Sequence, residues 1–383
     1  MILRGFLISL TFLLLANLSL AGEVTDVQLI TEGVEYFKIQ RYMENGVAIV
    51  HVLKIDPDRV EVIPVLPQRS PSILEKLIEW FGSWIPKGEV KEPHFNRATV
   101  STLVKQGNAI AGVNGTYFAE DNRPLGTLMI DEELISFPIY DRTALILSSE
   151  EASIDNVFVD ADLTLPDGSK IKISGFNRNR EKGEVVLYTF RYGKKTDPES
   201  AVLELTVMDD CVTKIKPPPS EIHENGIVIA FDSPYAEYLW QNLKVGDKID
   251  LNLELTTFSN SNTEIKHILG GGPRLLKSGV VYLTYHEEKF RPGIRKGRHA
   301  RTAVGITEDG KLLLVTVDKE KGISSGMRLE ELSGLMRDLG AQDAMNLDGG
   351  GSSTMVIRDR VINHPVYGSE IKVGNALIIR RKF

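Results

Sequence analysis

The densest group of residues with chemical potential is the string Asn346-Leu347-Asp348-Gly349-Gly350-Gly351-Ser352-Ser353. On a strand, residues two apart point to the same face, so Asn346 and Asp348 would project together. Three glycines follow, and backbone without side chains lets several N–H groups converge on an anion, while the two serines add hydroxyl donors. A plain glycine-rich turn would explain one or two of these glycines, but not the flanking Asn, Asp and Ser pair. The string therefore predicts a carboxylate beside an anion-binding loop.

Two further glycine-containing loops and one arginine are candidates for the same anion-binding site. Asn114-Gly115 follows a short apolar strand, and Gly270-Gly271-Gly272-Pro273 forms a loop that a ligand could approach closely. Alone, each is typical of a tight turn. Arg301 can hold a phosphate through paired N–H donors, although it could also be a surface residue of the basic stretch 291–301.

Two other polar residues stay open as additional site candidates. His299 lies two positions before Arg301, at the start of the same predicted strand. Asp318 follows the next predicted strand, where it would serve the site or simply begin a turn.

The elements that must position these residues are mostly strands. Residues 303–307 and 312–317 flank a Glu308-Asp309-Gly310 turn, which predicts a hairpin. A helical stripe over 329–339 ends at Gly340, and short strands are predicted at 344–347, 354–357 and 376–379. Strands mixed with few helices predict an α+β fold with mixed sheets.

Composition narrows the class of protein. The chain has 383 residues, of which 42% are hydrophobic and 25% charged, so it is expected to be globular. Its net charge of −7 argues against general nucleic-acid binding, which needs a basic surface. The single cysteine, Cys211, excludes an intrachain disulfide, so stability must come from packing.

The N-terminus predicts export. Arg4 precedes an apolar run that ends in Ser19-Leu20-Ala21, which has small residues where signal peptidase reads. We interpret residues 1–21 as a cleaved secretory signal, with an uncleaved anchor as the alternative. The expected location is therefore secreted or periplasmic, with no membrane span after cleavage.

Together, these motifs resemble the phosphodiester glycosidase family. Asn114-Gly115 with Tyr117-Phe118, Gly271-Gly272-Pro273, Arg301-Thr302, the 346–353 string and Asn375-Ala376-Leu377 match the family pattern in order. The resemblance implies a phosphodiester glycosidase-like domain over 97–149 and 266–383. That domain would be interrupted by a β-rich insertion at 150–265 and preceded by a β-rich segment at 22–96.

The resemblance implies hydrolysis of a sugar-1-phosphodiester at its anomeric carbon, on an envelope or extracellular glycan such as an exopolysaccharide. Asp348 would be the nucleophile or the base for water, with Arg301 and Asn346 as further catalytic residues. Substrate binding would fall to the remaining motif positions, which are Asn114, Gly115, Gly271, Gly272, Gly349, Gly350, Gly351, Ser352, Ser353 and Asn375. No cofactor is expected.

Two alternatives stay open. A metal-dependent phosphodiesterase would use Asp318 and Asp348 as oxygen ligands for a divalent ion and would break the P–O bond. A non-catalytic envelope protein would keep the pocket and bind a glycan without turnover. The expected partner in all three cases is a phosphoglycan or sugar phosphodiester, and the sequence does not determine the oligomeric state.

Overall fold

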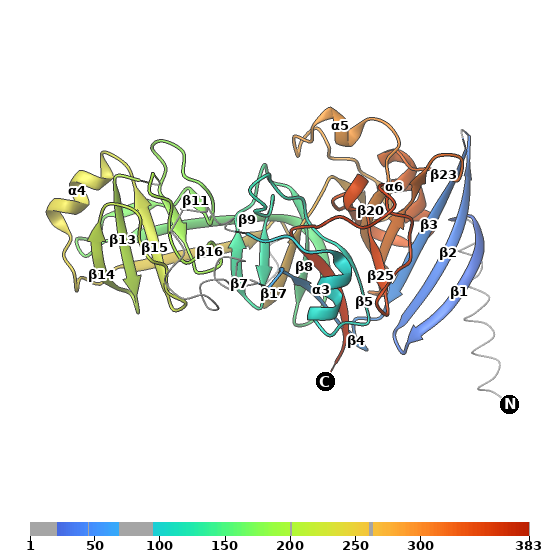
Figure 1. The fold of residues 1–383 in the computed structure, drawn as a ribbon, viewed down its shortest axis with the longest axis horizontal. Helices are drawn as coiled ribbons and strands as arrows, with labels where there is room; N and C mark the ends of the chain where they lie inside the picture. Colours follow the sequence, from blue (N-terminus) through green and yellow to red (C-terminus); the bar gives the residue numbers. More distant parts are fainter. Residues whose placement is uncertain (1–20, 45, 69–94, 200, 260–262, 383) are drawn as a thin grey trace, which may run out of the picture.

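The computed structural model describes residues 21–44, 46–68, 95–199, 201–259 and 263–382. Apart from Ala21, the predicted signal lies outside these residues. The described chain forms five β-sheets with short helices between them (Figure 1). The predicted α+β class with few helices is therefore confirmed, but among the described strands only β11 and β12 pair parallel, so the sheets are mainly antiparallel rather than mixed.

The largest sheet has eight strands that pair antiparallel in the order β1-β2-β3-β21-β20-β24-β18-β19. The predicted hairpin forms the centre of this sheet. Its turn contains Gly310, whose φ of +74° is a value that glycine adopts without strain. The strands in chain order are β1 (Glu23–Thr31), β2 (Val34–Met43), β3 (Gly46–Ile55), β18 (Arg274–Lys277), β19 (Val280–Val281), β20 (Arg301–Thr307), β21 (Leu312–Val317) and β24 (Ala341–Asn346).

A five-stranded antiparallel sheet packs against it. Its order is β26-β25-β5-β27-β4, with β4 (Val60–Val65), β5 (Ala111–Asn114), β25 (Met355–Ile357), β26 (Arg360–Val361) and β27 (Ala376–Arg381). Alternation along β27 shows how the layers form. Leu377 and Ile379 share a core with Val304 and Met345 of the large sheet, whereas Ile378 packs on the opposite side.

One helix covers the outer face of each of these two sheets. Helix α6 (Leu329–Asp338) packs on β18 and β24 through a buried stripe that includes Leu332, Leu335 and Met336. Helix α3 (Val100–Gln106) packs on β5 and β27. The result is a helix–sheet–sheet–helix sandwich, which encloses the main apolar core between the two sheets.

The remaining strands extend the molecule to one side (Figure 1). A seven-stranded sheet has the order β10-β9-β8-β17-β6-β7, with β16 also paired to β9. Its strands are β6 (Leu128–Ile130), β7 (Glu133–Ser136), β8 (Thr143–Ser148), β9 (Ala152–Thr164), β10 (Lys170–Lys172), β16 (Asp250–Thr257) and β17 (Ile265–Gly270).

An outer five-stranded sheet, in the order β11-β12-β15-β13-β14, forms the far end of the molecule. It consists of β11 (Gly175–Phe176), β12 (Val186–Tyr188), β13 (Leu203–Met208), β14 (Cys211–Lys216) and β15 (Gly226–Phe231), with α4 (Tyr235–Asn242) alongside. A β22 (Lys319–Glu320) and β23 (Ser324–Ser325) pair and the short helix α5 (Pro292–Arg295) complete the fold.

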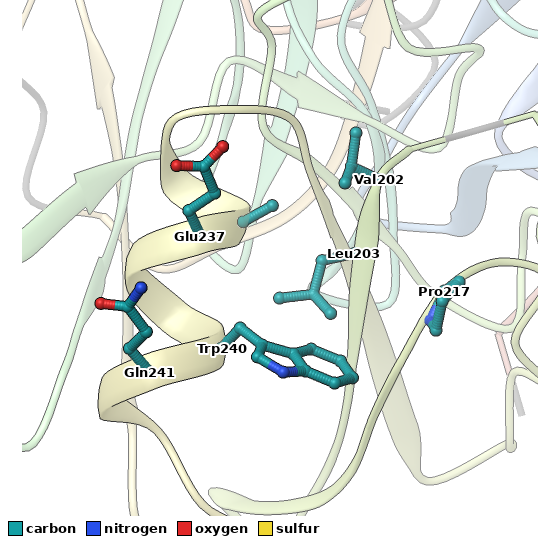
Figure 2. A pocket seen from close by; sticks show the side chains of 7 residues that line it. Val202, Leu203, Pro217, Glu237, Trp240 and Gln241 are labelled. Atoms are coloured by element: carbon teal, nitrogen blue, oxygen red, sulfur yellow. The ribbon is translucent and has the colours of Figure 1, made fainter.

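A hollow of about 290 Å³ opens between α4 and the outer sheet (Figure 2). Trp240 forms one wall and is 60% exposed, and Leu203 and Pro217 lie opposite. The lining is largely apolar and contains none of the residues that the sequence predicts for the site.

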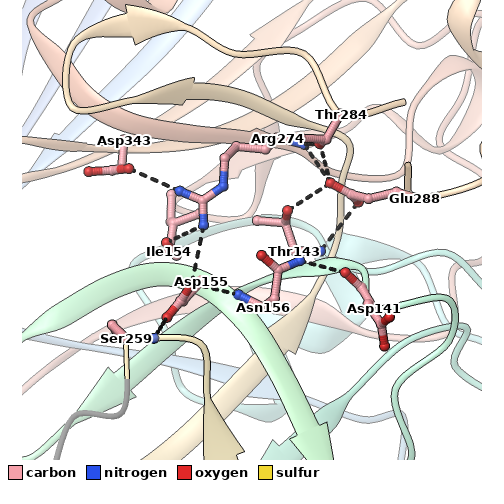
Figure 3. Close-up of polar contacts among 10 residues, drawn as sticks. All are labelled: Asp141, Thr143, Ile154, Asp155, Asn156, Ser259, Arg274, Thr284, Glu288 and Asp343. Carbon is pink, nitrogen blue, oxygen red and sulfur yellow. Dashed lines mark hydrogen bonds and ion pairs between the residues drawn. The ribbon is translucent and has the colours of Figure 1, made fainter. Parts of the chain in front are cut away.

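Buried polar contacts join the long strand β9 to the large sheet (Figure 3). Arg274 is 3% exposed, donates to the Ile154 carbonyl at 2.7 Å and pairs with Asp343 at 3.1 Å. Glu288 accepts from Thr143 Oγ1 at 2.7 Å and from the Arg274 N–H at 3.0 Å. These bonds satisfy charges that would otherwise be costly to bury, and they fix the loop that follows β17.

Candidate active site

The candidate site lies where the chain crosses from the large sheet to the five-stranded sheet. Strand β24 ends at Asn346, and residues 347–354 lead into β25. Backbone bonds hold this crossover: Leu347 N–H donates to Thr302 O at 2.8 Å, and Asp348 N–H donates to Gly115 O at 3.2 Å. The glycine string is therefore fastened to both sheets.

Asn114 organises the site from the end of β5. Its side chain is fully buried, and its Nδ2 donates to the Asp348 carbonyl at 2.7 Å. Its Oδ1 accepts from Thr302 Oγ1 at 2.8 Å and from Thr354 N–H at 3.1 Å. One amide thus joins three segments, so the structure gives Asn114 a positioning role.

Asn346 is also buried, beside Tyr117. Its Nδ2 lies 2.8 Å from the Tyr117 hydroxyl, which itself donates to Gly272 O at 2.9 Å. The Oδ1 of Asn346 is buried and has no hydrogen-bond partner among the described residues. Because a buried unpaired carbonyl is costly, this atom marks a place where a hydroxyl of a ligand or water could bind.

Asp348 is partly exposed, yet its carboxyl lies in a poorly solvated position. Burial raises the pKa of the Asp348 carboxyl from 3.8 to about 6, against the opposing effects of a hydrogen bond from Ser352 and one from the Gly349 N–H. The latter bond is 2.9 Å long. A carboxyl with a pKa near neutrality is suited to proton transfer or nucleophilic attack.

Arg301 is buried without a carboxylate partner among the described residues. It is 2% exposed, and its guanidinium donates to Met327 O and Ile294 O at 3.0 Å each, and to Gly297 O at 3.4 Å. Burial lowers the pKa of Arg301, but a guanidinium remains charged at neutral pH. Such a cation, hydrogen-bonded to main-chain carbonyls and not to a carboxylate, is suited to bind an anion.

Arg301 and Asp348 both lie close to Tyr117, but they do not form an ion pair with each other. Both affect the pKa of Tyr117, which burial and the Asp348 charge raise and Arg301 lowers. No ion pair joins the two residues within the described chain. The cation and the carboxylate therefore flank a common region in which a phosphodiester could lie.

The predicted anion-binding loop forms a single 3₁₀ turn, Gly350–Ser352, beside Arg301. A side chain on Gly349 would lie 3.0 Å from Ala300 O, whereas Gly350, with φ +62°, faces open space. Gly351 meets the ring of Tyr367, whose Cε2 would be 2.5 Å from an added Cβ. Ser352 and Ser353 are nearly buried, at 5% and 1% exposure.

The other predicted glycines are required by close packing. An added Cβ at Gly115 would clash with Asn375 Oδ1, and one at Gly271 would lie 2.9 Å from Asn346 O. An added Cβ at Gly272 would clash with the carboxylate of Glu288. The structure thus brings these glycines into the walls of the site, while direct substrate contact by them stays a prediction.

Asn375 lies fully buried next to Gly115. Its Oδ1 accepts from Thr116 N–H at 2.9 Å, and its Nδ2 has no partner among the described residues. It supports the loop after β5, and substrate contact through Nδ2 stays a prediction.

The two additional candidates differ in position. His299 Nε2 contacts Lys296 O at 2.9 Å, in the loop over Arg301. Asp318 is 1% exposed and pairs with His51 at 3.1 Å and with His364 at 3.3 Å. Across the described ranges, no three His, Cys, Asp or Glu side chains form a group suited to a metal ion.

Sequence reasoning missed several residues around the site. Tyr117 contributed to the family resemblance but not to the predicted site, because its contact with Asn346 spans 229 positions. His364 and Tyr367 follow β26 in a stretch with no motif signal. Thr302 was quoted beside Arg301, but only the fold shows that its hydroxyl holds Asn114.

Comparison with known proteins agrees with this fold. A hypothetical protein from Synechocystis superposes with a TM-score of 0.76 at 20% identity, covering 94% of this chain and 64% of that one. A candidate exported protein from Burkholderia pseudomallei gives 0.70 at 22% identity, covering 88% and 74%. At these identities the similarity establishes the fold alone.

Sequence relatives match over short stretches. An uncharacterised prophage-derived protein of Bacillus subtilis is 37% identical over 82 residues, which is 21% of this chain. Mouse N-acetylglucosamine-1-phosphodiester α-N-acetylglucosaminidase is 38% identical over 66 residues, which is 17% of this chain. The matched stretch spans 13% of the length of each of these relatives.

The family comparison covers most of the site. Residues 201–380 match the phosphodiester glycosidase family, a range that includes Arg301, Asp348 and the glycine loop but begins inside the predicted 150–265 insertion. The boundaries of that insertion stay a prediction. Over residues 201–380, this chain is therefore similar to the phosphodiester glycosidase family.

Proposed function

We propose that this protein hydrolyses a sugar-1-phosphodiester at the anomeric carbon, releasing free sugar and a phosphomonoester. The observation that supports the proposal most is the pair formed by Arg301 and Asp348. A buried guanidinium bonded only to main-chain carbonyls lies near a carboxyl whose pKa is raised to about 6, and the two do not neutralise each other.

In the proposed reaction, the substrate phosphate lies against Arg301 and the 349–353 loop. The bond between the anomeric carbon and the phosphate oxygen breaks, and its electron pair leaves with the phosphate. Because phosphate is already an anion and a good leaving group, charge stabilisation by Arg301 matters more than protonation by an acid. Water supplies the new oxygen on the sugar.

Asp348 has two possible roles in this reaction. As a base, it takes a proton from the attacking water; as a nucleophile, it forms a glycosyl ester that water then hydrolyses. Both roles require the ionised carboxylate. Asn114 holds the main chain of Asp348, and Asn346 Oδ1 is placed to accept a hydrogen bond from a sugar hydroxyl or water.

Isotope labelling tests which bond breaks. After turnover of a sugar-1-phosphodiester in ¹⁸O-water, mass spectrometry should place the label on the sugar and none on the phosphate. A metal-dependent phosphodiesterase requires the reverse, since attack at phosphorus labels the phosphate. A glycan-binding protein would give binding without turnover in the same samples.

The proposed location is outside the cytoplasm, on an envelope or extracellular glycan. Residues 1–21 have the pattern of a secretory signal, and a protein of the same fold is described as a candidate exported protein. Among the helices that the structure describes, none has the length and apolar character needed to cross a bilayer.

A further inference from the structure

A second arginine, Arg142, lies beside the candidate site. Its guanidinium carbon is 4.1 Å from the centre of the Phe290 ring and 5.9 Å from the centre of the Tyr117 ring. These two rings contact each other, with their centres 5.4 Å apart. The Tyr117 hydroxyl in turn bonds to Asn346, whose Oδ1 is buried and has no partner within the described chain. One side chain, Tyr117, therefore connects Arg142 to the proposed sugar-binding amide.

Arg142 and Arg301 are both contacted by the connection between β19 and β20. Phe290 packs on the Arg142 guanidinium, and four residues later the Ile294 carbonyl accepts from Arg301 at 3.0 Å. Burial raises the pKa of the Tyr117 hydroxyl, and the positive charges of Arg301 and Arg142 both oppose that rise. The two cations therefore lie near the same buried tyrosine.

The half-buried guanidinium of Arg142 keeps donors that no other group uses. Its Nε donates to the Glu288 carbonyl at 3.4 Å, and its two terminal nitrogens have no hydrogen-bond or ion-pair partner among the residues that the structure describes. The Glu288 carboxylate is a nearby negative charge, but it already accepts from Thr143 Oγ1 at 2.7 Å and from the Arg274 N–H at 3.0 Å. Contact with an aromatic ring holds a guanidinium in place without using its N–H donors, so those of Arg142 can bind an anion.

The contacts of Arg142 differ from those of Arg301. An added Cβ at Gly349 would lie 3.9 Å from Arg301 Cδ, so Arg301 and the 349–353 loop lie together. The ring and hydrogen-bond contacts of Arg142 are with Tyr117, Tyr140, Phe290 and the Glu288 carbonyl, and within the described chain none is with that loop. The two arginines are therefore placed to bind different anionic groups.

We propose that Arg142 is a second anion-binding residue, and that the substrate carries a further acidic group, a phosphate or a carboxylate, besides the phosphodiester that reacts. This inference rests on the proposed function. Arg301 and the 349–353 loop bind the reacting phosphate, and Arg142 binds the second group. Because an arginine can hold either acid through paired N–H donors, it selects a doubly anionic substrate over a singly anionic one.

Sulfonates are suitable probes, because they carry a fixed negative charge and do not titrate near neutral pH. Methanesulfonate offers one anionic group, whereas alkane disulfonates with two, three and four carbons offer two groups at different separations. In calorimetry at pH 7, the wild-type protein should bind at least one disulfonate about tenfold more tightly than methanesulfonate, because the second group belongs to a molecule that is already bound. Arg142→Gln should reduce this ratio to about twofold, the advantage of having two equivalent ends.

The matched control is Arg291→Gln, the same substitution at an exposed arginine of the same connection. It should keep the wild-type ratio, and an equal loss there would show a general effect of positive charge and overturn the contact. Arg142→Lys keeps the charge and should retain part of the preference. A purely structural role for Arg142, or a role shared with Arg301 on one phosphate, would weaken methanesulfonate and the disulfonates by the same factor. That result, or a wild-type ratio of twofold or less for every disulfonate, would refute the inference.

Turnover then shows where the second group lies on the substrate. Three sugar-1-phosphodiesters are compared: one without a further charge, one with a carboxylate on the sugar, and one with a phosphate on the aglycone. The kcat/KM should be highest for one of the two acidic substrates, and Arg142→Gln should remove that advantage. A wild-type protein that prefers the substrate without a further charge would contradict the inference, while label on the sugar in the ¹⁸O experiment would still support the proposed function. Label on the phosphate would instead overturn the proposed function and leave the disulfonate result unchanged.

Discussion

The side-chain amide of Asn114 donates a 2.7 Å hydrogen bond to the main-chain carbonyl of Asp348, 234 positions later in the chain. Asn114 ends β5 of the five-stranded sheet, and Asp348 lies two residues beyond β24 of the large sheet. The bond therefore joins the two layers of the sandwich at the proposed reactive carboxylate. A small change in the packing of the two sheets would be transmitted directly to Asp348.

Asn114→Asp tests this junction. The substitution keeps the shape of the side chain but replaces its donor with an oxygen facing the Asp348 carbonyl, so the free energy of unfolding should fall by about 2–4 kcal/mol. Turnover should fall as well. Asn242→Asp is the matched control, because Asn242 donates a similar 2.8 Å bond to Tyr238 O at an exposed helix end. The control should lose less than about 1 kcal/mol of unfolding free energy. Equal losses in the two variants would contradict a special role for the Asn114 bond between the two sheets.

Asp348→Asn should abolish turnover while leaving the protein as stable or more stable. The pKa of Asp348 is about 6 in the folded chain against an ordinary 3.8, so ionisation destabilises the fold as pH rises from about 4 to 6. The amide avoids this cost, and the melting temperature of the variant relative to wild type should be higher at pH 7 than at pH 4. Exposed Asp250→Asn serves as control. If Asp348→Asn retains more than about a tenth of wild-type activity, it has lost less than ~1.4 kcal/mol of transition-state stabilisation, and Asp348 is not the reactive carboxylate.

The pH dependence of the reaction should follow the same group. Whether Asp348 is base or nucleophile, its ionised form is active, so kcat/KM should fall with decreasing pH through about 6. A phosphodiester substrate is itself ionised throughout this range, which leaves the enzyme as the source of the change. A rate that stays constant down to pH 4 would exclude Asp348 as the required carboxylate.

Arg301→Lys should lower both activity and stability. Lysine keeps the charge but cannot form the three bonds to Ile294, Gly297 and Met327 while presenting two donors to a phosphate. We expect kcat/KM to fall at least 100-fold and the free energy of unfolding to fall by about 1–3 kcal/mol. Arg191→Lys, at an exposed pair with Glu133, should change neither. Unchanged kinetics for Arg301→Lys would remove it from the phosphate site.

Gly350→Ala separates backbone strain from function. Gly350 and Gly310 both have positive φ, +62° and +74°, and at both an added Cβ would meet open space. Alanine should therefore cost a similar ~1 kcal/mol of stability at each position. Activity should fall at Gly350 alone, because Gly350 lies in the 349–353 loop proposed to bind the phosphate, and its N–H holds that loop to Ala300 O. Equal activity in the two variants would show that this loop tolerates the change.

Local sequence was sufficient for much of the fold and part of the site. The alternation on β20 and β21, the turn at Gly310 and the apolar stripe of α6 each depend on neighbouring residues, and each appears where the pattern predicts it. Asp348 and its glycines could be selected as candidates in the same way, because their residue types are unusual within eight consecutive positions, and their role in the reaction stays a prediction.

The environment of those residues was decided by tertiary structure. Whether Arg301 would be a surface residue or a buried cation depended on main-chain carbonyls from two segments, Ile294 and Gly297 on one and Met327 on the other. The pKa of Asp348 depends on burial between two sheets, and the contact of Asp318 with His51 spans 267 positions. Burial and long-range hydrogen bonds arise only when distant segments pack together, so no local pattern in the sequence specifies them.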